Sequence, residues 1–226
     1  MNDASIYQNN TVKVWDISIR LMHWSLVAGI GFLWFSGEEG GTIMKWHIYT
    51  GYYMLGLVTY RFLWGFMGSR YARFSNFLYS PKNTFTYAQK LLNKQSKAYI
   101  GHNPLGGWMV LTLLLLVLIQ AISGLFTSDD IFTEGPLYIL VSSKTGDLLT
   151  SIHHLNFNFL LAAIALHLTA VAYHSLIKKE PLIKGMISGD KTINTPLNTL
   201  PKTNYLLMCV IGGISATGVY WLVNLA

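Results

Sequence analysis

The sequence predicts an all-α integral membrane protein, a helical bundle in which a four-helix core is followed by a fifth, C-terminal transmembrane helix. The composition supports this fold class, since 52% of the 226 residues are hydrophobic and only 12% are charged, which is too apolar for an ordinary soluble domain. The apolar residues also gather in runs of about 20, the length that crosses a bilayer as a helix. Polar turns and basic segments separate these runs.

Five apolar runs define the expected helices. They lie at 19–36, 47–66, 106–126, 152–177 and 205–225. Residues 1–191 are therefore expected to form one transmembrane domain, 192–204 a linker with two prolines, and 205–226 the additional helix. A short glycine-rich turn joins the first two runs, so we expect these two helices to form an antiparallel hairpin.

Two longer connections carry further signals. Residues 84–92 have the pattern of an amphipathic helix, which we expect to lie along the membrane surface. Asn103 and Pro104 predict an N-cap and a first helical residue at the start of the third core helix. The loop 127–151 is acidic and contains an apolar patch, 137–141, that is too short to cross a bilayer. We expect this loop to face a partner protein.

The net charge of +6 is distributed in a way that predicts the membrane orientation. Fourteen of the 16 Lys and Arg residues lie in or at the edges of segments 1–18, 65–105 and 178–204. Segments 37–46 and 127–151 hold one lysine each, together with six of the ten acidic residues. The positive-inside rule then places the N-terminus in the cytoplasm and the C-terminus outside. The basic excess indicates contact with anionic membrane lipid and not binding of nucleic acid.

Four histidines lie within or at the edges of the apolar runs, where an ionisable side chain is costly and indicates a function. They are His23, His47, His153 and His167. A spacing of 14 residues places His153 and His167 on one helical face, about 21 Å apart along the axis. His154 would point to nearly the opposite face from His167, so His153 is the better candidate.

The order of the runs across the membrane pairs these histidines by height. His47 and His153 lie on the outer side, and His23 and His167 lie nearer to the cytoplasm. Two histidines at one height can occupy both axial positions of a heme iron, which suits electron transfer better than oxygen chemistry. Cys209 is the one cysteine, which excludes a Cys-x-x-Cys-His attachment. We therefore expect two non-covalent heme b groups stacked across the membrane.

Other residues are candidates for contact with these cofactors. Gly51, one turn from a candidate ligand, would let a flat porphyrin approach the backbone. Arg20 and Arg61 lie where heme propionates need cationic partners, although Arg61 equally fits an arginine that snorkels to the surface and sets the topology. His102 either shapes a helix entry or ligates a heme. His174 is an interfacial histidine, a third ligand or a proton carrier at a quinone site.

A series of short motifs extends over residues 12–191. They are Val14-Trp15-Asp16, Arg20 with His23-Trp24, His47 with Gly51-Tyr52, Arg61 with Trp64-Gly65-Phe66 and Gly68, Ala72-Arg73-Phe74, Gly101-His102-Asn103-Pro104, His153 with His167, and then Ser175 and Glu180. In combination they resemble the bacterial cytochrome b561 and nickel-hydrogenase b-type cytochrome family of four-helix diheme membrane proteins. The resemblance implies that the same four histidines ligate two b hemes. The fifth run lies beyond the core of that family.

The predicted function is electron transfer between the quinone pool and a periplasmic redox partner in respiratory electron transport. The resemblance implies a hydrogenase subunit or a c-type cytochrome as this partner, quinone as the substrate, and the bacterial cytoplasmic (inner) membrane as the location. It leaves open a homodimer, and whether the chain is an electron-transfer subunit or a quinone-linked oxidoreductase. Two other classes are alternatives: a non-redox anchor or transporter, which would be colourless, and a stand-alone quinol oxidase with an accessible outer heme edge.

Overall fold

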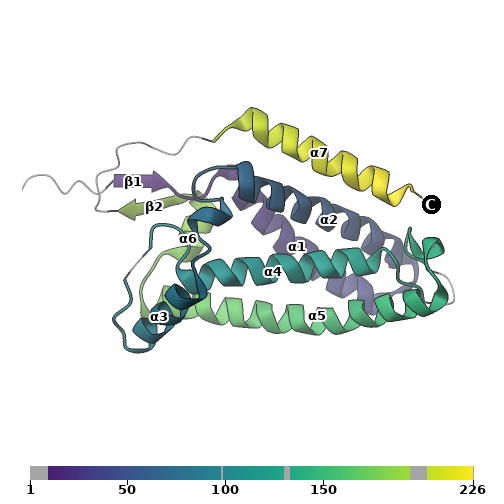
Figure 1. Ribbon diagram of the computed structural model, residues 1–226, viewed down its shortest axis with the longest axis horizontal. Coiled ribbons are helices and arrows are strands. Elements are labelled where there is room, and N and C mark those ends of the chain that lie inside the picture. Colours follow the sequence, from purple (N-terminus) through teal and green to yellow (C-terminus); the bar gives the residue numbers. More distant parts are fainter. Residues whose placement is uncertain (1–9, 98, 130–132, 194–202, 226) are drawn as a thin grey trace, which may run out of the picture.

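The structure is a computed structural model that describes residues 10–97, 99–129, 133–193 and 203–225. Within these residues, five long helices form an elongated bundle, and shorter elements cover one end of it (Figure 1). The long helices are α1 (Ile17–Glu39), α2 (Met44–Met67), α4 (Pro104–Gly124), α5 (Ser143–Ala172) and α7 (Tyr205–Val223). The shorter elements are β1 (Asn10–Lys13), α3 (Pro81–Leu92), α6 (Leu182–Ser188), β2 (Asp190–Ile193), three 3₁₀ turns (Gly41–Ile43, Phe74–Asn76, Tyr138–Leu140) and a π-helical turn (Tyr173–Ile177) that continues α5.

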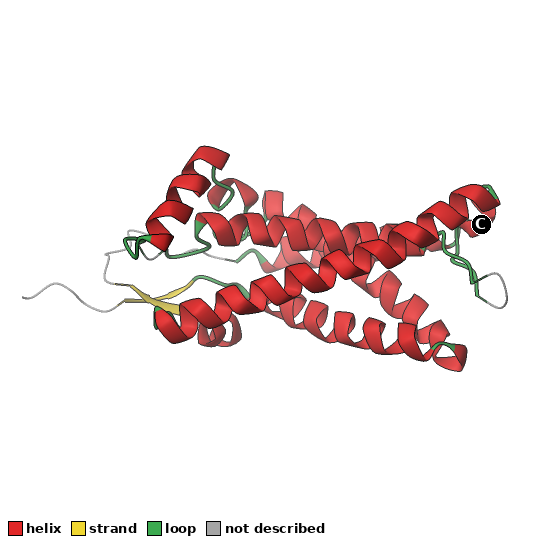
Figure 2. Cartoon of the chain, turned by 90° about the horizontal axis from the view of Figure 1, so that it is seen from below, coloured by secondary structure: helices red, strands yellow, loops and turns green. Residues whose placement is uncertain are grey.

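The two ends of the bundle differ, and each is named here by what covers it. The ribbon end carries β1, β2, α3 and α6, and the loop end carries the segment between α4 and α5 (Figures 1 and 2). α1, α4 and α7 begin at the ribbon end, whereas α2 and α5 begin at the loop end. The chain therefore alternates in direction from helix to helix, as the short turn and the longer connections predict.

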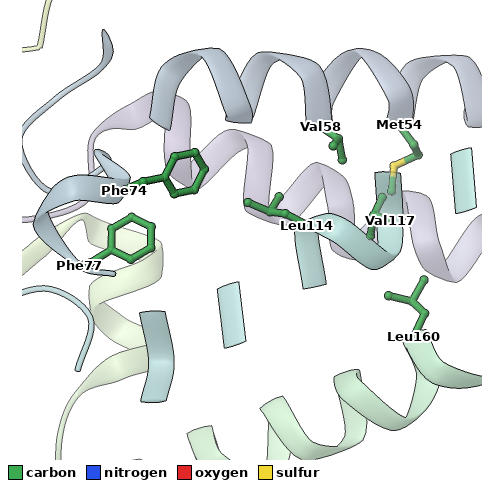
Figure 3. Packing of buried hydrophobic residues seen from close by; sticks show 7 residues of the cluster. All are labelled: Met54, Val58, Phe74, Phe77, Leu114, Val117 and Leu160. Atoms are coloured by element: carbon green, nitrogen blue, oxygen red, sulfur yellow. The ribbon is translucent and has the colours of Figure 1, made fainter. Parts of the chain in front are cut away.

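α2 lies at the centre of the bundle. It packs against α1, α4 and α7, and α4 also packs against α5. Figure 3 shows the main buried cluster, which draws side chains from α2, α4, α5 and the segment that follows α2. Its members are Met54, Val58, Phe74, Phe77, Leu114, Val117 and Leu160. This cluster holds the middle of the bundle together between its two ends.

The surface of the bundle is apolar, as a lipid-facing surface must be. Leu166 and Leu168 of α5 are each 60% exposed, and Trp221 of α7 is 67% exposed. Four of the described helices are long and apolar enough to cross a membrane, namely α1, α4, α5 with its π-helical turn, and α7. α2 has 24 residues but is less apolar, because it contains Lys45, Arg61 and several tyrosines. The predicted membrane bundle is confirmed, with the correction that the run 47–66 falls short of the apolarity of its neighbours.

Local sequence signals account for the helix ends. Asn103 caps α4 by accepting a hydrogen bond from the Gly106 amide at 2.8 Å, which confirms the predicted start. Ser142 caps α5 in the same way, so α5 begins nine residues before the apolar run at 152. Gly40 and Gly41 have positive φ angles of 62° and 56°, a conformation that glycine adopts without steric cost. They reverse the chain between α1 and α2.

A two-stranded antiparallel ribbon was not predicted. Asn10 pairs with Ile193, and Lys13 pairs with Asp190. The ribbon continues to Gly189, whose carbonyl accepts the amides of the two residues that precede Asp16, at 2.9 and 3.1 Å. The expected domain boundary at 191 and the first two residues of the expected linker 192–204 therefore lie in β2, and residues 194–202 lie outside the described residues. Each strand is too short, and its partner too distant in the sequence, for a local pattern to reveal the pairing.

Asp16 joins the start of α1 to the end of α2. One carboxylate oxygen accepts the Ile19 amide at 2.9 Å and so caps α1. The other accepts the indole N–H of Trp64 at 3.1 Å and the hydroxyl of Ser69. Asp16 and Trp64 are 7% and 0% exposed. A single buried carboxylate thus satisfies donors from both helices and sets their spacing at the ribbon end.

We predict that Asp16→Ala lowers the free energy of unfolding by about 2 kcal/mol or more. Loss of the cap costs about 1 kcal/mol, and the indole N–H left buried without a partner costs about 1–3 kcal/mol. Thermal unfolding in detergent, followed by tryptophan fluorescence, measures the change. Asp147→Ala, at an exposed position of α5, is the matched control and should leave the midpoint unchanged. Equal midpoints for all three proteins would contradict the role given to Asp16.

Candidate functional site

The loop end of the bundle brings together two of the four predicted histidines. His47, in the first turn of α2, and His153, in α5, face each other with ring centroids 6.4 Å apart and ring planes inclined by 63°. Both rings are partly buried, whereas His154 is exposed. His153, which the helical spacing favours over His154, therefore lies opposite His47.

The Ser36 hydroxyl lies within hydrogen-bond distance of Nδ1 of His47. Ser36 of α1 donates its one hydroxyl hydrogen to the Phe32 carbonyl at 2.8 Å. Its oxygen is then left to accept a hydrogen bond from Nδ1 of His47 at 3.1 Å. We assign the proton of the neutral ring to Nδ1 on this basis. The lone pair of Nε2 is then available to a metal ion.

The same arrangement recurs at His153. Ser123 of α4 donates to the Ile119 carbonyl at 2.7 Å, and its oxygen accepts from Nδ1 of His153 at 3.2 Å. The Gln120 carbonyl accepts from the same Nδ1 at 2.9 Å. Nδ1 is again the protonated nitrogen, and Nε2 again has a free lone pair. The two facing imidazoles thus share one tautomer, set by matching contacts on two helices.

These serines, and the glycines that follow them, are not among the site residues that the sequence predicts. A Cβ on Gly37 would lie 3.3 Å from Cε1 of His47, and one on Gly124 would lie 3.0 Å from Cε1 of His153. The glycines therefore give each imidazole room to lie against its serine. A Ser-Gly pair at the loop end of both α1 and α4 is the sequence signal that could have revealed them.

A cavity of about 450 Å³ adjoins the two imidazoles and is lined by α1, α2, α4, α5 and the loop after α4. Gly51 lies on its wall, and a Cβ added there would meet no atom within 4 Å. At Gly29, by contrast, a Cβ would lie 2.5 Å from the Met54 sulfur, so this glycine serves helix packing. The backbone of α2 at Gly51 therefore borders open space, where a flat ligand can approach it.

The other two histidines lie nearer to the ribbon end. His23 is near the start of α1, and His167 is near the end of α5. Both are partly buried and interact electrostatically with each other. Nδ1 of His23 is buried and has no hydrogen-bond partner among the described residues. His153 and His167 lie on one uninterrupted α-helix, so the spacing that predicts a common face applies to both.

The two predicted arginines have different surroundings. Arg20 donates from Nη1 to the Ile187 carbonyl at 2.5 Å and so contacts α6. Arg61 is 2% exposed, and its guanidinium lies over the rings of Phe74 and Phe77, at 5.0 and 5.8 Å from their centroids. This burial excludes the alternative in which Arg61 snorkels to the surface.

His102 and His174 also lie at the ribbon end. The His102 ring packs against Trp15 and Phe77, with centroids at 4.5 and 4.7 Å. Burial is the main reason why the pKa of His102 falls to about 3, so the ring is neutral. His174 is buried and lies 3.4 Å from a carboxylate oxygen of Glu180. The contact with Glu180 gives His174 a protein partner of its own.

Among the described residues, no group of three or more His, Cys, Asp or Glu side chains is placed to hold a metal ion. A site with two facing imidazoles instead suits a metal that brings most of its own ligands, as the iron of a porphyrin does. The chemistry available at such a site is electron exchange at the metal.

Comparison with known proteins points to the same chemistry. The family described as prokaryotic cytochrome b561 matches residues 14–189. Three similar proteins each bear the name "Probable Ni/Fe-hydrogenase B-type cytochrome subunit". The protein of Rhodobacter capsulatus is 22% identical and covers 83% of this chain and 84% of its own. The protein of Bradyrhizobium diazoefficiens is 22% identical, and the match covers 80% of this chain and 86% of the relative. The protein of Azotobacter chroococcum is 24% identical, with 81% of this chain and 90% of the relative covered.

No solved structure matches the chain. The family match begins just after β1 and ends just before β2, so it contains all four candidate ligands and excludes α7. Because this match covers most of the sequence, the chain belongs to the prokaryotic cytochrome b561 family and is a membrane-bound b-type cytochrome, which binds heme and transfers electrons.

Proposed function

We propose that this cytochrome holds two b hemes and carries electrons between the quinone pool and a periplasmic redox protein, as part of a respiratory chain. The observation that carries the proposal is the facing pair of His47 and His153, whose Nδ1 atoms are both engaged by serines. Such a pair has its Nε2 atoms free to ligate, and it lies beside a cavity at one end of a membrane bundle.

The distance between the two rings is compatible with both imidazoles holding one iron. A metal bonded to two imidazoles at about 2 Å from each nitrogen separates the ring centroids by about 6 Å. The separation of His47 and His153 is 6.4 Å. The cavity beside them, with the open backbone at Gly51, provides room for a flat macrocycle.

The second heme is proposed between His23 and His167. Their electrostatic interaction supports this pairing, because it requires the two rings to lie near each other. Arg20 and Arg61 lie at the same end of the bundle, where they supply positive charge for the propionates.

Each heme, when bound, supplies an iron that exchanges one electron between its ferric and ferrous forms. The four histidines would hold the two irons, two histidines to each heme, which suits electron transfer better than oxygen chemistry. Ser36 and Ser123 orient the imidazoles and raise their basicity by accepting from Nδ1. α5 carries one ligand of each site, about 21 Å apart along the axis, so one helix sets the distance over which electrons pass.

Charge supports an orientation in which the ribbon end faces the cytoplasm and the loop end the periplasm. Most of the basic residues border the ribbon end, whereas Glu38, Glu134 and Asp147 are at the loop end. The chain would then be a multi-pass protein of the bacterial inner membrane. The names of its relatives favour a hydrogenase subunit as the redox partner, with a c-type cytochrome as the second choice.

The direct test is a reduced-minus-oxidised visible spectrum of the purified protein, with pyridine hemochrome quantitation. We expect about two b hemes per chain, low-spin bands, and reduction by a short-chain quinol. One heme per chain would mean that only one of the two histidine pairs binds heme. A folded but colourless protein, expressed with ample heme, would leave a non-redox anchor or transporter as the better account.

The pairing of ligands makes a separate prediction. His47→Ala should remove the loop-end heme and leave the other largely bound, because the two sites share no ligand. His154→Ala is the matched control, since its side chain is exposed and adjoins the ligand on α5; it should retain both hemes. Heme content and redox titration of each variant measure this. Loss of the ribbon-end heme alone from His47→Ala would refute the pairing.

The serine contacts predict a change in redox potential. Ser36→Ala removes an acceptor from Nδ1 of His47, which makes the imidazole a weaker donor to iron. The midpoint potential of the loop-end heme should rise, and its retention in detergent should fall roughly tenfold. Ser151→Ala, at an exposed serine of α5 that bonds the Asp147 carbonyl, should change neither. Identical potentials in both variants would show that Ser36 does not act on the ligand.

A further inference from the structure

Arg61 is a buried cation whose Nη1 has no hydrogen-bonded counter-ion among the residues that the structure describes. Its side chain is enclosed by Phe74 and Phe77, and its Nη1 is buried with no hydrogen-bond partner among the described residues. A buried charge is costly unless it is paired and hydrogen-bonded. Ring faces attract the cation, but they do not accept the in-plane N–H groups of the guanidinium. The position therefore lacks an anionic acceptor.

The carboxylate that interacts with Arg61 is already in use. Asp16 attracts Arg61 electrostatically, but its two oxygens accept from a backbone amide, an indole and a hydroxyl. These contacts cap α1 and hold α2, so the carboxylate cannot turn toward Nη1 without breaking them. The attraction from Asp16 lessens the cost of burying Arg61 and leaves its hydrogen-bonding need unmet.

His102 has the same need and lies against the same ring. Phe77 contacts the guanidinium of Arg61 on one side and the imidazole of His102 on another. Nδ1 of His102 is buried without a hydrogen-bond partner among the described residues. Arg61 and His167 both interact electrostatically with His102, and the charge of Arg61 adds to burial in lowering the pKa of His102, so these three groups lie within electrostatic range. An unsatisfied guanidinium donor and an unpartnered imidazole nitrogen, which donates in the tautomer that carries its proton there, therefore adjoin Phe77, close to a proposed heme ligand.

We propose that Arg61 and His102 together bind a carboxylate, and that this carboxylate is a propionate of the heme held by His23 and His167. The inference rests on the ribbon-end heme of the proposed function and adds His102 to that site. A heme propionate is an anion that must find donors near the membrane surface, and a guanidinium is well suited to bind it. Arg20 differs in that its Nη1 already donates to the Ile187 carbonyl, but its Nε is buried without a hydrogen-bond partner among the described residues, so it stays available to the other propionate.

The test compares heme b with its dimethyl ester, which has the same ring and iron but no free carboxylate. Full-length His47→Ala protein, prepared from heme-deficient cells, offers only the ribbon-end site. Titration of the Soret absorbance should show that heme b binds about tenfold more tightly than the ester, or better, since hydrogen bonds to charged groups are strong. Arg61→Gln in the same background should reduce this preference to about twofold or less. His102→Phe, which keeps the aromatic packing, should reduce it in part.

Arg73→Gln is the matched control. Arg73 is exposed, and its Nε donates to the Gly68 carbonyl, so the preference for heme b should remain in that variant. Equal binding of heme b and its ester to the His47→Ala protein overturns the inference. A preference that survives both Arg61→Gln and His102→Phe also overturns it. If Arg61→Gln does not fold, His102→Phe decides the matter, and an unchanged preference in that variant counts against the proposal.

Two further outcomes separate this inference from other accounts. If neither compound binds to the His47→Ala protein or to wild type, the proposed heme sites fail and the inference fails with them. If both compounds bind alike, while phosphatidylglycerol raises the unfolding temperature of wild type but not of Arg61→Gln, the anion is a lipid phosphate. That result overturns the propionate assignment and leaves the heme sites standing.

Discussion

The hydrogen bonds to Nδ1 of His47 and His153 are the interactions on which the loop-end site depends. A histidine on a single helix can rotate about its side-chain bonds and change its tautomer. A hydroxyl that has already donated its own hydrogen removes both freedoms, because it can only accept. The packing of α1 on α2 and of α4 on α5 is what brings each serine to its histidine. The turn at Gly40 and Gly41 brings α2 back against α1 and so helps to place Ser36 beside His47.

The ribbon end depends on buried charges in a different way. Asp16 is satisfied within the protein and gains rigidity from three donors, so it fixes the ends of α1 and α2. Arg61 is held by aromatic rings but lacks an acceptor. In a low-dielectric interior, a carboxylate with all its donors, such as that of Asp16, is stable without a ligand. An unpaired guanidinium, such as that of Arg61, is stabilised by binding an anion. At the ribbon end, Asp16 thus has its acceptors paired within the protein, whereas Nη1 of Arg61 has no partner among the described residues.

The central place of α2 suits a helix that is not among the candidate membrane spans. α1, α4 and α7 shield it, so it can carry tyrosines, a histidine and an arginine at little cost from lipid contact. α7 lies outside the family match and yet packs on α2 through Ile211 and Ser215, which are 2% and 3% exposed. This additional helix therefore covers the polar helix on the side that the four-helix core leaves free.

The sequence alone determined the helical membrane class, the long helices and the identity of the candidate ligands, because apolar runs and helical spacing are local properties. It also placed Gly51 one turn from His47 on the same side of the helix. The angle around the helix axis relative to His167 favoured His153 over His154. Only the tertiary structure decided the tautomer-setting roles of Ser36 and Ser123, the burial of Arg61 and the ribbon that joins residues 10–13 to 190–193. Each of these is a contact between segments far apart in the chain, and no period or spacing within one segment encodes it.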